Sequence, residues 1–172
     1  MACRFGSMAI VLALLLGGCG FHPLYADHTK SGFDADLAAI KVNTIQDRLG
    51  QELALSLRDG LNPTGIRVAP RYALDVKLVA ERNDLGIRKD ATSSRTQMMI
   101  IADFQLKELA TDRTVLQGKT RTAVSFDSQT DEYANAVARQ SAQERSLRDL
   151  SDDIRMRLAV YVSQHRSTAR AY

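Results

Sequence analysis

The chain has 172 residues, of which 45% are hydrophobic and 25% charged, with 10 Gly, 3 Pro and 2 Cys. This composition indicates one globular domain and excludes the collagen-like, disordered and disulfide-scaffold classes. The formal net charge of +3, mixed along the chain, gives no indication of nucleic-acid binding.

Residues 1–18 differ from the rest, since Arg4 is their only charge and Met8 to Leu16 is an unbroken apolar run. A positive start, a short apolar run and small residues at its end are typical of a secretory signal peptide. The uncharged stretch is shorter than the ~20 residues that a permanent transmembrane helix needs. We therefore predict that residues 1–18 are a signal peptide for export.

Cys19 ends the sequence Leu16-Gly17-Gly18-Cys19, which resembles the bacterial lipobox. Its thiol can carry a diacylglyceryl unit, so that Cys19 becomes the lipidated first residue of the mature chain. The alternative is an ordinary cleavage site that happens to precede a cysteine. Acylation would account for a lone cysteine in an oxidising compartment and would anchor the chain without spanning the membrane. In lipoproteins of this kind, Gly20 in place of Asp implies the outer membrane.

Residues 19–36 show no sustained period and are interpreted as a lipidated tether to a domain over residues 37–165. Apolar residues then alternate at Ala38, Ile40 and Val42, which predicts a short strand. A four-residue period follows and predicts a helix over about 45–60, with a capping box at Thr44 to Asp47. The helix period is carried by Ile45, Leu49, Leu53, Leu57 and Leu61.

Three longer alternating runs predict strands around residues 72–81, 98–106 and 116–126. The second run is apolar on both faces, because Met99 and Ile101 add to its main apolar face, so we expect it to be central or covered on both sides. Residues 83–95 are predicted to form a polar loop, and Thr111 to Arg113 a tight hairpin.

The last segment has an approximately 3.6-residue period from Tyr133 to Tyr161, preceded by a capping box at Ser128 to Asp131. Its middle is small and polar, so we expect a bend or break between Ser141 and Ser146. Residues 166–172 are predicted to be a flexible tail. The order of elements indicates an α+β fold, a two-layer sandwich with two helices on one face of a four-stranded mixed sheet.

Catalytic and metal-binding signatures are missing from the sequence. The histidines His22, His28 and His165 lie far from Cys or Glu at ligand spacing, so no metal or cofactor is expected beyond the covalent lipid on Cys19. Basic residues remain, in the loop and on the wet face of the last strand. They are either solvated surface or a phosphate-binding patch, since Lys and Arg both suit sugar phosphates.

The lipobox runs directly into Gly20-Phe21-His22-Pro23-Leu24-Tyr25, and the helix core, the Tyr72-x-Leu74 strand and the ending from Tyr133 follow in order. This arrangement resembles the LptE family of lipopolysaccharide-assembly lipoproteins. The resemblance implies a non-enzymatic outer-membrane subunit that plugs an LptD-type barrel, helps it fold and assists lipopolysaccharide delivery. It also implies basic lipopolysaccharide contacts, for which Arg88, Lys89, Lys119 and Arg121 are the candidates by strand face and loop position.

Two other functions stay open at this point. The first is a free-standing periplasmic lipoprotein that is accessory to a lipid or drug transport complex. The second is an anchored hydrolase, which is disfavoured because the sequence shows no convergent polar site.

Overall fold

The computed structural model describes residues 31–87, 94–128 and 131–169. These residues form, in chain order, α2 (Ser31–Ala38), β1 (Ile40–Val42), α3 (Asp47–Leu61), β2 (Tyr72–Ile87), β3 (Ser94–Glu108), β4 (Arg113–Ser128) and α4 (Glu132–Ala169). The four strands make one sheet in the order β1-β2-β3-β4, with β1 and β2 parallel and the other pairs antiparallel. The predicted α+β fold with a mixed four-stranded sheet is confirmed.

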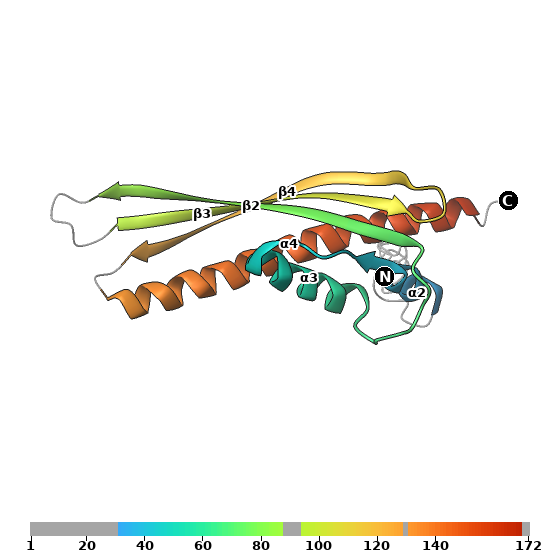
Figure 1. The fold of residues 1–172 in the computed structure, drawn as a ribbon, viewed down its shortest axis with the longest axis horizontal. Helices are drawn as coiled ribbons and strands as arrows, with labels where there is room; N and C mark the ends of the chain where they lie inside the picture. The colour runs from blue at the N-terminus through green and yellow to red at the C-terminus, as the bar shows by residue number, and fades with distance from the viewer. Residues whose placement is uncertain (1–30, 88–93, 129–130, 170–172) are drawn as a thin grey trace, which may run out of the picture. The chain divides into compact units, whose positions relative to one another are not determined.

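Helices α3 and α4 lie together below the sheet and form the second layer (Figure 1). The predicted period is the reason, because Leu53, Leu57 and Leu61 of α3 are all buried. They meet Leu150, Ile154 and Leu158 of α4 and the apolar inner face of the sheet in one core. A third helix, α2, overlaps the end of the segment interpreted as a tether and runs into the domain, so the described residues hold three helices where two were expected.

The inner face of β3 is the centre of the core. Its apolar row is buried along its whole length, as the alternation predicts: Met98, Ile100, Ala102, Phe104 and Leu106. The ring of Phe104 lies against Gly118 on β4, where a Cβ atom would come within 2.6 Å of the ring. A glycine at this position therefore lets the strand backbone pack directly on the aromatic ring.

The expected polar loop over residues 83–95 is wrong in its bounds. Strand β2 continues to Ile87 and β3 begins at Ser94, with Asn83 opposite Gln97 and Asp84 opposite Thr96. The polar composition misled the prediction because strand pairing is satisfied by the backbone and does not require apolar side chains.

The expected bend in the last helix is also wrong, because α4 is one helix from Glu132 to Ala169. Ala142 and Ser146 are buried, and the Ser146 hydroxyl donates to the Ala142 carbonyl at 2.9 Å. Small residues thus let the helix pack closely, and the surrounding Gln, Glu and Arg are good helix formers.

The two predicted capping boxes are not used as expected. Helix α3 starts at Asp47 with a φ of 68°, and Gln46 precedes it without a side-chain cap. Helix α4 is capped by Asp131, whose carboxylate accepts the backbone N–H of Tyr133 at 2.9 Å. Within the described residues, no helix is both long enough and apolar enough to span a membrane.

Candidate functional site

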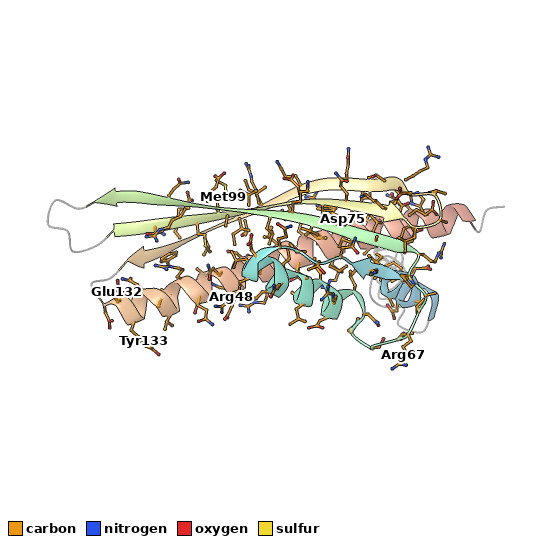
Figure 2. The ribbon with its side chains drawn as sticks, viewed as in Figure 1. Arg48, Arg67, Asp75, Met99, Glu132 and Tyr133 are labelled. Atoms are coloured by element: carbon orange, nitrogen blue, oxygen red, sulfur yellow. The ribbon has the colours of Figure 1, made fainter. Side chains whose placement is uncertain are left out.

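The outer face of the sheet, which turns away from α3 and α4, carries rows of side chains in register across β2, β3 and β4. Lys77 stands opposite Asp103, which stands opposite Lys119. The next row joins Val79, Ile101 and Arg121, so a charged row borders an apolar one. Figure 2 shows Asp75 and Met99 in the sheet layer and Arg48, Glu132 and Tyr133 in the helix layer.

A hollow of about 1150 Å³ occupies part of this face. It extends from residues 44–47, beside the edge of β2, to β4. Its polar lining includes three lysines, three aspartates and three glutamines: Lys77, Lys107, Lys119, Asp47, Asp75, Asp103, Gln46, Gln105 and Gln117. The hollow is therefore a mixed-charge surface that offers cations and hydrogen-bonding amides together.

Asp75 is the most constrained charge in the hollow. Its carboxylate accepts a hydrogen bond from the Asn43 side-chain amide at 2.7 Å and forms an ion pair with Lys107 at 3.0 Å. These two contacts, with the Asn43 bond as the larger effect, lower the pKa of Asp75, and the same pair raises the pKa of Lys107. The ion pair with Asp75 thus holds the Lys107 side chain in place, and we therefore assign Lys107 a structural role.

Lys119 and Arg121, two of the candidates named from the sequence, both lie on the outer face of β4. Lys119 forms an ion pair with Asp103 at 3.2 Å and remains largely exposed. Arg121 is exposed beside Ile101 and has no carboxylate in its own row. The other candidates, Arg88 and Lys89, lie outside the described residues, as does Cys19.

Lys77 and Lys107 belong to the same face but were not singled out from the sequence. Alternation along β2 already places Lys77 on the wet face. The missing information was the register, because Lys77 joins Lys119 only through the pairing of both with Asp103. The structure thus adds Lys77 to the two candidates that it describes.

The apolar part of the outer face lies next to these cations. Val79 is 49% exposed, and Met99 and Ile101 are half-buried. Ala123 stands opposite Met99 and is exposed. Strand β3 is central in the sheet, one of the two arrangements expected from its two apolar faces, and none of the described residues covers this side of it. An anionic group bound at the lysines would therefore have apolar surface beside it.

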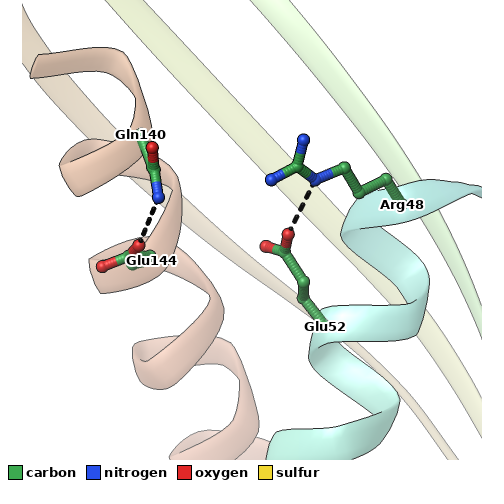
Figure 3. Close-up of polar contacts among 4 residues, drawn as sticks. All are labelled: Arg48, Glu52, Gln140 and Glu144. Carbon is green, nitrogen blue, oxygen red and sulfur yellow. Dashed lines mark hydrogen bonds and ion pairs between the residues drawn. The ribbon is translucent and has the colours of Figure 1, made fainter. Parts of the chain in front are cut away.

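The helix layer carries a second groove, of about 440 Å³, between α3 and α4. Four of its polar residues pair within their own helices, Arg48 with Glu52 at 3.0 Å and Gln140 with Glu144 at 3.1 Å (Figure 3). Such exposed pairs contribute little to stability, and the remaining charges of the groove, Asp59 and Arg148, are of opposite sign. This groove therefore lacks the aligned cations of the sheet face.

Other chemistry has little support in the described residues. No three His, Cys, Asp or Glu side chains gather there as a metal site would require. Tyr161, whose pKa is raised mainly by burial, stacks between Tyr72 and His165 at the far end of α4. Within the described residues, the sheet face is the surface that combines exposed cations with neighbouring apolar side chains.

Comparisons with known proteins agree with this architecture. A family model described as LptE, lipopolysaccharide-assembly, matches residues 36–158. A lipoprotein structure from Caulobacter crescentus matches with a TM-score of 0.62 and 24% identity over 77% of this chain and 96% of that one. The minor lipoprotein of Acinetobacter baumannii matches with a TM-score of 0.55 and 17% identity over 70% and 91%. No curated protein matches in sequence.

Proposed function

The chain belongs to the LptE lipopolysaccharide-assembly family, and we propose from this premise that it is an outer-membrane lipoprotein in complex with an LptD-type barrel. Its role in that complex is to assist delivery of lipopolysaccharide to the outer leaflet. Members of the family are non-enzymatic assembly lipoproteins, so the sheet face is a binding surface. The family match is the observation that carries the proposal.

Membrane attachment is proposed to be through acyl groups on Cys19 after removal of residues 1–18. The support is the lipobox in the sequence, Leu16-Gly17-Gly18-Cys19. The intact mass of the protein extracted from membranes tests this step. A mass of residues 19–172 plus acyl groups is expected, and an unmodified chain would contradict it.

The barrel partnership is supported by the polar character of the helix layer and the sheet face. Both carry exposed ion pairs of mixed sign, such as Arg157 with Asp153 at 3.0 Å and Lys119 with Asp103 at 3.2 Å. The lumen of an outer-membrane barrel is polar, so such a surface suits it. Purification of the acylated protein from outer membranes should recover a much larger barrel in equal amount. Recovery without a barrel would favour a free-standing lipoprotein.

Lipopolysaccharide is proposed to contact the outer sheet face at Lys77, Lys119 and Arg121. Lipid A phosphates would meet these cations, and acyl carbons would lie on Val79 and Ile101 in the neighbouring row. Arg88 and Lys89 remain proposed contacts from their sequence position.

The test measures lipopolysaccharide binding by the mature chain carrying Lys77→Gln, Lys119→Gln and Arg121→Gln together. If each cation contributes roughly 0.5–1 kcal/mol to the binding free energy, the triple variant should bind lipopolysaccharide about 10- to 100-fold more weakly at low salt. The matched control removes three exposed cations of the helix layer, Arg48, Arg139 and Arg145. Equal affinity of the two variants would reject the sheet face. A separate Arg88→Gln, Lys89→Gln variant tests the loop.

A further inference from the structure

Strand β4 is the last strand of the sheet, and no strand of the described residues pairs with its other side. Its pairing with β3 is continuous from Leu116 to Ser128, without a bulge and without proline. No backbone hydrogen bond outside the sheet is recorded for β4 in the described part of the chain. Such a long regular edge presents a row of N–H and C=O groups that can pair with another strand.

A hollow of about 430 Å³ lies along this edge, between β4 and α4. Residues 119–122 line it from the strand, and Asp149, Leu150, Asp153 and Arg157 line it from the helix. A strand added to a sheet needs room on its inner side, because alternate side chains point to that side. The hollow supplies this room at the centre of the open edge.

Two charges at this hollow have no ion-pair partner within the described ranges. Arg121 is exposed on the outer face, and Asp149 is exposed on α4. Their neighbours are already paired, Lys119 with Asp103 and Arg157 with Asp153. Opposite charges on adjacent strands attract, so an added strand gains from an acidic side chain on its outer face and a basic one on its inner face.

We propose that the β4 edge accepts an extended polypeptide segment of a partner protein as a fifth strand. The segment places an acidic residue beside Arg121 and, next to it along the chain, a basic residue facing Asp149. Main-chain hydrogen bonds hold it, and the two charges set its register. A second copy of this chain is a poor occupant, since antiparallel self-pairing centred on Thr120 would put Lys119 opposite Arg121 of the other copy.

The first test compares hydrogen exchange of the acylated protein alone and in the complex isolated from outer membranes. Within residues 116–126, the amides that face the open edge and not β3 should exchange at least tenfold more slowly in the complex, while those of α3 change less. Equal exchange of β4 in the two samples overturns the proposal. Slow exchange of the edge-facing amides already in the isolated protein overturns it as well, because the edge would then be covered by this chain itself or by a second copy.

The second test uses the alternation of N–H groups along an antiparallel strand. Of two neighbouring residues, Thr122 and Ala123, one N–H faces β3 and the other faces the open edge. Thr122→Pro and Ala123→Pro are compared with Thr122→Val and Ala123→Val, which keep the N–H. The proline variant that keeps the wild-type Tm should lose at least tenfold of the co-purified partner, and the valine variants should keep it. Retention by that proline variant, or equal loss by its valine control, overturns the proposal.

This inference is separable from the proposed function. If a barrel co-purifies while the β4 amides stay unprotected, the proposed fifth strand is contradicted and the proposed role with lipopolysaccharide is not. Protection of β4 by a partner that is not a barrel would support the strand and contradict the barrel.

Discussion

Replacing Gly118 by alanine tests how β3 and β4 pack over the core. The added Cβ would lie 2.6 Å from the Phe104 Cζ atom and 2.9 Å from its Cε1 atom, inside van der Waals contact. Phe104 is 1% exposed and has core residues around it, so its ring has little room to move. We expect a loss of about 1–3 kcal/mol in the free energy of unfolding, as for other overpacked cores.

The assay is urea and thermal unfolding of the mature chain. At about 2–4 °C per kcal/mol for a domain of this size, the Tm should fall by roughly 2–12 °C. Gly60→Ala, within helix α3, is the matched control, because the nearest atoms to its Cβ belong to the flexible side chain of Arg155 on α4, at 3.3 Å. That variant should be neutral or more stable by up to about 1 kcal/mol.

Relief of the overlap gives a second check. Phe104→Leu removes the ring atoms that the new Cβ would meet, so the double variant should lose less stability than the sum of the two single variants. A Gly118→Ala protein as stable as wild type, or strict additivity with Phe104→Leu, would refute the packing argument.

Three further predictions concern single residues. Because its folded pKa is lowered, ionised Asp75 stabilises the fold above its ordinary pKa of 3.8, and this contribution is lost as the pH falls through the lower folded value. The difference in the free energy of unfolding between wild type and Asp75→Asn, measured with urea, should therefore be largest at neutral pH and should decrease below pH 3.8. Asp131→Ala removes the α4 cap and should cost about 1 kcal/mol, with faster hydrogen exchange in the first turn. Asp112 has a φ of 52° in the β3–β4 hairpin, so Asp112→Val should lower stability by about 1–2 kcal/mol and Asp112→Gly should not, both measured by thermal unfolding.

Much of the fold is predictable because burial of one face of a helix or strand makes apolar residues recur at a regular spacing in the sequence. The row from Met98 to Leu106 and the leucines of α3 show this clearly. Helix α2 escapes the same reasoning, since its eight residues offer only Phe33 and Leu37 as an apolar pair. Continuity of α4 depends on close packing of Ala142 and Ser146, which composition alone does not reveal.

The candidate site is predictable only in part. Alternation places Lys119 and Arg121 on the wet face, but the rows that join them to Lys77 and Val79 depend on strand register. Register is set by the turns and by side-chain pairing across strands. The composition of a polar stretch such as 83–95 indicates neither where the turn lies nor which residues pair. The hollow further depends on Asn43, which directly follows β1 and donates a hydrogen bond from its side-chain amide to Asp75 on β2.

The central claim is that this lipoprotein helps lipopolysaccharide reach the cell surface through its outer sheet face. The direct measurement is the amount of newly made lipopolysaccharide in the outer leaflet of cells depleted of the protein. We predict that it falls on depletion and is restored by the wild-type chain, but only weakly by the Lys77, Lys119 and Arg121 triple variant. Normal surface lipopolysaccharide in depleted cells would contradict the account.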